Sequence, residues 1–178
     1  LAEGEIKQGL NRFDSSQSFE SYLDKSYCKT ASLIANSSKA IGVLSDVDQD
    51  RLKSLYFFGR QLGLAFQVVD DILDFTGNDE QLGKPAASDL QSGYLTAPVF
   101  YALEENSSLG ELINGKFSNK DDLDKALSLV RDSSAIQKSR ELAEKFASES
   151  KDSISWLPDS PSKKALLELP EFVIGRLY

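Results

Sequence analysis

The chain has 178 residues, of which 40% are hydrophobic, and this is enough to build the core of one globular domain. It carries 20 lysines and arginines against 28 aspartates and glutamates, and the resulting formal charge of -8 argues against a nucleic-acid-binding surface. Histidine is absent and Cys28 is the single cysteine, which excludes an internal disulfide, a Cys/His zinc site and the usual Ser/His or Cys/His nucleophile pairs.

Apolar residues recur at helical spacing along almost the whole chain, and no alternating run bounded by hairpin turns competes with them. The pattern therefore predicts an all-α fold, organised as a single domain over residues 1–178. Residues 77–95 are rich in Gly, Ser, Asp and Pro and lack periodicity, so we expect a long loop with a short helical turn, of the kind that is usually functional. Helices are expected over residues 1–13, 18–44, 48–76, from 96 onward, 119–132, 134–157 and 162–178.

Several residues indicate how these helices begin, end and pack. The stretch "SDVD" at 45–48 and Thr96 are cap-type residues that precede expected helices, whereas Pro170 should kink or split the last one. Gly59 and Gly63 are four residues apart within an expected helix, where each glycine costs about 1 kcal/mol relative to alanine. Such glycines indicate a close contact with another helix.

The stretch "FQVVDDILDF" at residues 66–75 places three aspartates among apolar side chains. Asp70 and Asp74 are four residues apart and share one face of the expected helix, with Asp71 at its edge. A buried carboxylate is expensive unless it is paired. Either an Arg or Lys of a neighbouring helix faces these aspartates, or the face points to water, or the carboxylates bind a hard divalent cation such as Mg²⁺.

Four stretches resemble one family, in the family's order and spacing: "LAEGEIKQ", "YLDKSYCKTASLIANSSKA", "LGLAFQVVDDILDFTG" and "LGKPAASDLQSGYLTAP". From residue 1 to about residue 103 the sequence resembles the second half of a trans-type polyprenyl diphosphate synthase, most similar to the long-chain octaprenyl or solanesyl members. The resemblance implies an isoprenoid synthase fold, in which antiparallel helices surround a central cavity. It also implies that this chain is a C-terminal fragment of a longer synthase.

In such enzymes the sequence "DDILD" is the second of two aspartate-rich motifs. By that resemblance, Asp70 and Asp74 contribute to Mg²⁺ binding and Asp71 supports them. The first aspartate-rich motif, with its arginine pair and the residues that bind isopentenyl diphosphate, is absent from this chain.

The resemblance also assigns roles in binding the substrate. Lys29 would clamp the allylic diphosphate, and the oxygens of Thr30 and Gln67 would face the developing carbocation. Lys84, in "GKP", matches a loop lysine that closes over the departing diphosphate. The family usually has a second lysine after this loop, where this chain has Tyr94, so one diphosphate contact is missing or replaced.

The function that these features favour is a Mg²⁺-dependent prenyltransferase, which condenses an allylic diphosphate with isopentenyl diphosphate into an all-E polyprenyl diphosphate. One alternative is a non-catalytic regulatory subunit of the same fold that pairs with an active synthase; another is an unrelated helical interaction module. The resemblance implies a homodimer, and the fragment alone should be inactive. No apolar stretch approaches 18 residues, so we expect a soluble protein of the cytoplasm or of an organelle stroma or matrix.

Overall fold

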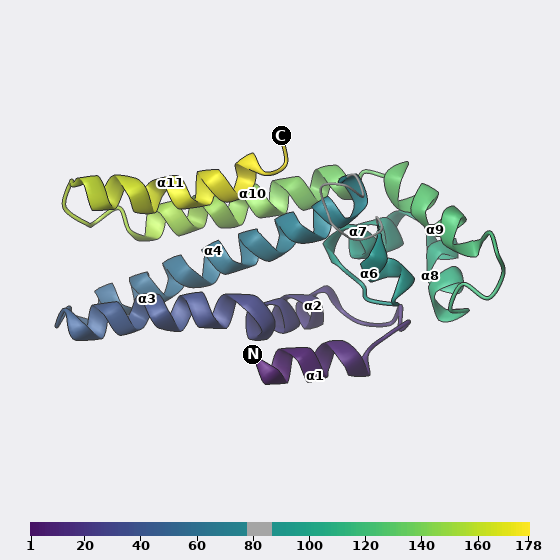
Figure 1. Ribbon diagram of the computed structural model, residues 1–178, viewed down its shortest axis with the longest axis horizontal. Helices are drawn as coiled ribbons and strands as arrows, with labels where there is room; N and C mark the ends of the chain where they lie inside the picture. Colours follow the sequence, from purple (N-terminus) through teal and green to yellow (C-terminus); the bar gives the residue numbers. More distant parts are fainter. Residues whose placement is uncertain (78–86) are drawn as a thin grey trace.

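The computed structural model describes residues 1–77 and 87–178, and within these ranges the chain forms helices and no strand (Figure 1). The prediction of an all-α fold is therefore confirmed. The helices are α1 (Ala2–Leu10), α2 (Phe19–Ser26), η1 (Tyr27–Ala31), α3 (Ser32–Leu44), α4 (Gln49–Thr76), α6 (Ser88–Gln91), α7 (Ala97–Glu105), α8 (Ser107–Asn114), α9 (Asp122–Arg131), α10 (Ala135–Ser153) and α11 (Pro161–Gly175).

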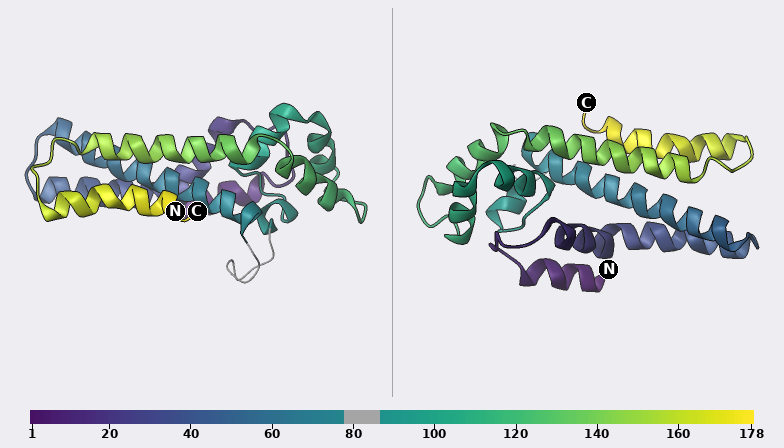
Figure 2. Two further views of the ribbon diagram at one scale, coloured as in Figure 1. Left: turned by 90° about the horizontal axis from the view of Figure 1, so that it is seen from above. Right: turned by 180° about the vertical axis from the view of Figure 1, so that it is seen from behind.

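Helix α4 is the central element of the molecule. It lies between α3 on one side and α10 on the other, and α11 runs alongside α10 (Figures 1 and 2). The short helices α6 to α9 gather at one end of these long helices, and α1 lies beside α2 and η1. Val68, Val69 and Ile72 of α4 are fully buried, and burial of each such side chain contributes about 1.5–3 kcal/mol.

Side-chain caps begin α4 and α11, whereas Thr96, also expected as a cap, precedes α7 without a side-chain cap hydrogen bond. Asp48 accepts hydrogen bonds from the backbone N–H groups of Asp50 and Arg51 at the start of α4, as the cap-type residues before it predict. Ser160 caps α11 in the same way. Of the kink or split expected at Pro170, the split is wrong, because α11 continues through this residue to Gly175. Pro170 is itself buried, so packing of the helix compensates for the lost backbone hydrogen bond.

The helix expected over residues 18–44 contains a feature that its sequence pattern does not reveal. The five residues of η1 form a π-helical turn between α2 and α3. A Cβ atom on Gly63 would lie 2.5 Å from the Cα atom of Ala31, and one on Gly59 would lie 2.5 Å from the carbonyl oxygen of Ile34. Both glycines thus allow α4 to approach η1 and α3 closely, which confirms the close helix contact that they indicate.

Helix α8 is an element that the sequence pattern does not predict. None of the helices within the described ranges is long and apolar enough to cross a membrane.

Candidate functional site

A cavity of about 450 Å³ lies where η1, the C-terminal half of α4 and the end of the chain meet. The structure brings five of the predicted site residues to this cavity: Lys29, Thr30, Gln67, Asp70 and Asp71. Its remaining lining residues are Phe66, Leu73, Asp89 and Arg176. Of the other two predicted site residues, Asp74 does not line the cavity, and Lys84 lies outside the described residues.

A chain of three hydrogen bonds runs through the wall of this cavity. The Tyr22 hydroxyl donates to Oδ2 of Asp71 at 2.6 Å, and Nε2 of Gln67 donates to Oδ1 of Asp71 at 2.9 Å. The Thr30 hydroxyl in turn donates to Oε1 of Gln67 at 2.7 Å. This chain connects α2, η1 and α4, and it uses both oxygens of Asp71.

The electrostatics of Asp71 follow from its burial. The side chain is 3% exposed, and removal from water raises the pKa of Asp71 to about 6, although hydrogen bonds from Tyr22 and Gln67 oppose the rise. Burial and the nearby carboxylate raise the pKa of Tyr22 well above its usual value, so the phenol remains a hydrogen-bond donor. Asp71 is therefore held by neutral donors.

Asp70 points toward the cavity and is paired with a residue that the sequence pattern does not identify. Its Oδ1 atom lies 2.7 Å from Nη2 of Arg176, and the Arg176 guanidinium lies 4.9 Å from the centroid of the Phe66 ring. One of the alternatives considered for these aspartates, pairing with an arginine or lysine from elsewhere in the fold, is thus observed for Asp70. Both side chains are more than 30% exposed, however, and such surface pairs contribute only about 0–1 kcal/mol. The pair is thus too weak to prevent Asp70 from binding a cation.

Asp74 is buried and holds the first residues of α6. Its carboxylate accepts hydrogen bonds from the Ser88 hydroxyl and from the backbone N–H of Asp89, both at 3.1 Å. Its own carbonyl oxygen accepts from the N–H of Ala87 at 2.6 Å. These bonds fix Asp89 at the cavity. A role of Asp74 as a direct metal ligand stays a prediction.

Two lysines, Lys25 on α2 and Lys29 on η1, bring positive charge to the site. Nζ of Lys29 lies 3.7 Å from Oε1 of Glu5 on α1. One turn earlier, Nζ of Lys25 donates to the carbonyl oxygen of Leu95 at 3.1 Å, and burial lowers the pKa of Lys25. Lys25 and Lys29 line an adjoining small cavity together with Tyr94. Two lysines therefore lie side by side where an anionic ligand would need them.

The cavity fits a magnesium ion that also binds a phosphorylated substrate. Mg²⁺ takes oxygen ligands, keeps several waters and usually binds one or two carboxylates together with substrate phosphates. Asp70 supplies a partly exposed carboxylate, and Asp89 lines the same cavity. Within residues 1–77 and 87–178 no three acidic, His or Cys side chains gather into a metal site by themselves, so the phosphates would have to complete the coordination.

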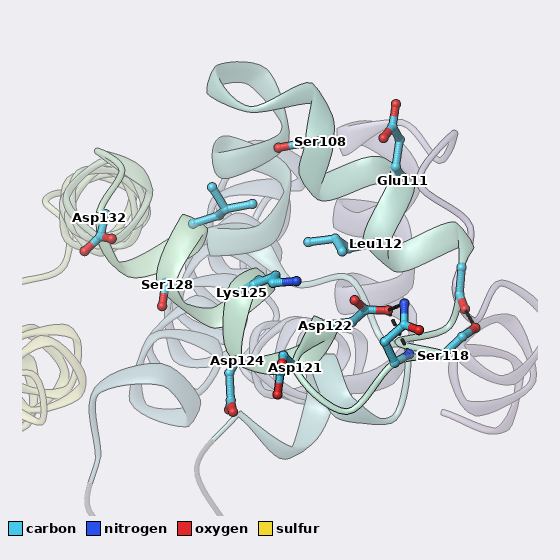
Figure 3. A pocket seen from close by; sticks show the side chains of 13 residues that line it. Ser108, Glu111, Leu112, Ser118, Asp121, Asp122, Asp124, Lys125, Ser128 and Asp132 are labelled. Atoms are coloured by element: carbon cyan, nitrogen blue, oxygen red, sulfur yellow. Dashed lines mark hydrogen bonds between the residues drawn. The ribbon is translucent and has the colours of Figure 1, made fainter.

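A larger cavity, of about 900 Å³, lies between α8 and α9 (Figure 3). Five acidic side chains and Lys125 line it, and this excess of negative charge disfavours an anionic substrate. In Figure 3 the side chains of Leu112 and Lys125 point into the space between the helices, whereas Asp124 and Asp132 point away from it. The hydrogen bonds of Asp122 at this cavity are local, since its Oδ2 atom accepts from the backbone N–H and from Nδ2 of Asn119. The acidic residues that line it are Glu111, Asp121, Asp122, Asp124 and Asp132.

Comparison with known proteins identifies the family. Residues 1–130 match the family model described as "Polyprenyl synthetase". The chain belongs to the polyprenyl synthetase family. A prenyl transferase of Synechocystis sp. is 54% identical over 178 residues, which is 100% of this chain and 55% of that protein. The chloroplastic solanesyl diphosphate synthase 2 of Arabidopsis thaliana is 44% identical over 177 residues, which is 99% of this chain and 42% of that protein.

The structure agrees with the family assignment. The crystal structure of heptaprenyl diphosphate synthase from Staphylococcus aureus matches with a TM-score of 0.91 at 31% identity, and the match covers 98% of this chain and 55% of that chain. The fold is therefore the isoprenoid synthase fold of the polyprenyl synthases, as predicted. The chain spans about half the length of the curated relatives that it matches.

Four residues of the candidate site are not among the site residues predicted from the sequence: Tyr22, Lys25, Asp89 and Arg176. Lys25 and Tyr22 could have been found, because they lie about one and two helical turns before Lys29. Asp89 stands in the family-like stretch that contains Lys84. Arg176 carries no local signal, since it reaches the site from the far end of the chain.

Proposed function

We propose that the full-length protein condenses an allylic diphosphate with isopentenyl diphosphate to form an all-E polyprenyl diphosphate. The observation that carries this proposal is the cavity of about 450 Å³ at which Lys29, Thr30, Gln67 and Asp70 meet. The names of its relatives, prenyl transferase and solanesyl diphosphate synthase, support the same reaction.

Mg²⁺ is the cofactor that we propose, with Asp70 as its ligand in this chain. When bound, it would neutralise charge on the diphosphate and so assist its departure. Asp71 supports this arrangement from inside the wall, and Asp74 holds Asp89 at the cavity. Asp74 as a second ligand is a further part of the proposal, and it requires the cation to displace the Ser88 hydroxyl or the Asp89 N–H from the Asp74 carboxylate.

The other residues of the cavity act on the substrate directly. Lys29 attracts and holds the allylic diphosphate, because its ammonium group lies at the cavity in an otherwise acidic protein. The Thr30 and Gln67 oxygens stabilise the positive charge that develops on the allylic carbon. Phe66 offers an apolar surface to the isoprenoid tail. Lys84 is proposed as an additional diphosphate ligand from outside the described residues.

A homodimer is the assembly that we propose. Exposed apolar side chains on α3 support it, since a helical chain that leaves such side chains in water needs a partner or a further segment to cover them. The exposed residues on α3 are Leu33, Ile41, Val43 and Leu44. Sedimentation of the full-length protein at micromolar concentration tests this, and a monomer would contradict it.

The chain is proposed to act as one domain, in the cytoplasm or in an organelle stroma or matrix. The names of relatives described as chloroplastic and mitochondrial support an organelle. Import of a fluorescent fusion into isolated organelles would test this location.

The proposed reaction is tested by incubating the full-length protein with an allylic diphosphate, radiolabelled isopentenyl diphosphate and Mg²⁺. We expect radioactivity in a longer prenyl diphosphate and its loss on chelation of the metal. No incorporation by this protein alone, together with a changed rate of an active synthase to which it is added, would instead indicate a regulatory subunit. No incorporation alone and no effect on an active synthase would contradict both functions.

A further inference from the structure

The Tyr22 hydroxyl is a buried group for which the proposed reaction has no direct use. The Tyr22 side chain is 2% exposed, and its hydroxyl lies 2.6 Å from Oδ2 of Asp71. Asp71 lines the cavity but is only 3% exposed, and both of its oxygens already accept hydrogen bonds, from Tyr22 and from Gln67. The effect of these two residues on the reaction is therefore expected to pass through the residues that Asp71 contacts.

Asp71 fixes the orientation of the Gln67 amide. An ionised carboxylate accepts hydrogen bonds and donates none, so the amide group that faces Oδ1 of Asp71 must be the NH₂ of Gln67. The NH₂ group and the carbonyl oxygen of a glutamine side chain point away from each other, on opposite sides of the amide carbon. The carbonyl oxygen of Gln67 is therefore directed toward Thr30.

The carbonyl oxygen of Gln67 in turn fixes the orientation of the Thr30 hydroxyl. The Oε1 atom of Gln67 can only accept, so at 2.7 Å the Thr30 hydroxyl must donate its single hydrogen to it. What remains at the cavity are the lone pairs of the Thr30 oxygen. An oxygen presented in this way stabilises a developing positive charge, whereas a hydrogen would repel it.

Resting on the proposed function, we propose that Tyr22 and Asp71 are positioning residues that fix the direction of the hydrogen-bond chain from Thr30 through Gln67 to Asp71. Tyr22 holds Asp71 in place, Asp71 selects the amide orientation of Gln67, and Gln67 takes the hydrogen of Thr30. The structure thereby turns oxygens, and not hydrogens, toward the carbon at which positive charge forms. A carboxylate with both oxygens used in this way is not required to bind metal.

The variant Asp71→Asn reverses this direction. The new side chain would still accept from Tyr22 through its oxygen, but its NH₂ group would then face Gln67 and force the Gln67 amide to turn over. Gln67 would donate to Thr30, and the Thr30 hydrogen would point into the cavity. We expect kcat of the full-length protein to fall about 10²-fold, with KM for the allylic diphosphate changed less than about threefold.

The double variant Asp71→Asn/Gln67→Glu restores the direction. The carboxylate at position 67 accepts from both the new amide and the Thr30 hydroxyl, and the total charge equals that of the wild type. We expect kcat to recover to within about tenfold of the wild type. If Asp71→Asn fails to fold, the double variant alone carries the test, and a double variant that is unfolded or remains 10²-fold impaired overturns the proposal.

Tyr22→Phe and Tyr27→Phe form a matched pair on the same helical stretch. Tyr22→Phe removes the bond that holds Asp71, and we expect kcat to fall about tenfold without a change in KM. Tyr27 hydrogen-bonds with Tyr56 at 2.5 Å, outside the chain of bonds, so Tyr27→Phe should keep the wild-type kcat. Equal effects of the two variants on kcat would overturn the role of Tyr22.

Mg²⁺ titrations separate positioning from metal binding. The Mg²⁺ concentration that half-maximally raises the melting temperature should change less than about threefold in Asp71→Asn, because both oxygens of Asp71 are occupied by protein donors. An increase beyond tenfold would make Asp71 a metal ligand and overturn the proposal. A wild-type protein without incorporation would contradict the proposed reaction, whereas an active wild type with a wild-type-like Asp71→Asn would contradict the positioning role.

Discussion

The Nη2 atom of Arg176, which directly follows α11, lies 2.7 Å from Oδ1 of Asp70 on α4. The last turn of the chain is thereby attached to the aspartate that we propose as a metal ligand. A cation at Asp70 would compete with this guanidinium, so the free energy of the ion pair opposes metal binding. This free energy is small, about 0–1 kcal/mol for a pair this exposed.

Arg176→Gln should strengthen Mg²⁺ binding, because it removes the competing positive charge. Loss of an ion pair worth about 1 kcal/mol corresponds to a decrease of up to about fivefold in the Mg²⁺ concentration that half-maximally raises the melting temperature. Arg51→Gln is the matched control. Arg51 also pairs with an aspartate, Asp48, and lies 4.9 Å from an aromatic ring centroid, that of Trp156, but far from the cavity. Weaker Mg²⁺ binding in Arg176→Gln would contradict the competition.

Gly63→Ala should damage both stability and turnover. The added Cβ atom would lie 2.5 Å from the Cα atom of Ala31, so α4 and η1 must separate. We expect a loss of about 1–3 kcal/mol in unfolding free energy by denaturant titration, and a 10- to about 100-fold lower kcat through displacement of Thr30. Gly9→Ala is the control, because nothing lies within 4 Å of its added Cβ. It should not destabilise the protein.

Glu105→Gln should weaken the stability of the protein near neutral pH. The hydrogen bond from the Ser134 hydroxyl, together with Lys138, lowers the pKa of Glu105 from 4.5 to about 2. The folded state thus favours the carboxylate, so its stabilising contribution is complete above about pH 4.5 and is lost as the pH falls toward 2. Wild type and variant should therefore differ in melting temperature at pH 7, and the difference should shrink below about pH 4.5 and vanish as the pH falls through about 2.

The exposed pair of Glu168 with Lys164 on α11 supplies the control for this pH dependence. Glu168→Gln removes a carboxylate that contacts lysine only within its own helix. Its melting temperature should follow that of the wild type across the same pH range. A constant difference between wild type and Glu105→Gln at all pH values would contradict the titration of Glu105.

Helix positions could be predicted from the sequence where an apolar stripe is long and bounded by caps. The helix expected over residues 48–76 is observed as Gln49–Thr76, with Asp48 as its cap. The π-helical turn η1 could not be predicted in this way, because it accompanies the close approach of Gly63 to Ala31, a contact between two helices. Helix α8 is short and contains Gly110, which weakens its helical signal.

The candidate site likewise contains residues that the sequence predicts and residues that only tertiary packing brings there. Lys29, Thr30, Gln67 and Asp70 could be placed together because family-like motifs carry them, and the structure brings them to one cavity. Arg176 could not be placed there, because its contact with Asp70 depends on how α11 packs beside α4. The direction of the hydrogen bonds at Asp71 depends likewise on tertiary contacts, although the residues themselves are visible in the sequence.

The variant Asp70→Asn in the full-length protein tests the proposed metal–diphosphate site most directly, when melting temperature and Mg²⁺-dependent incorporation of isopentenyl diphosphate are measured on one preparation. The substitution keeps the size of the side chain and removes its charge. We predict a change in melting temperature below about 4 °C, since only an exposed ion pair is lost, and a kcat lower by about 10²- to 10³-fold. A markedly lower melting temperature with wild-type turnover per folded molecule would contradict the account, because Asp70 would then serve only as the partner of Arg176.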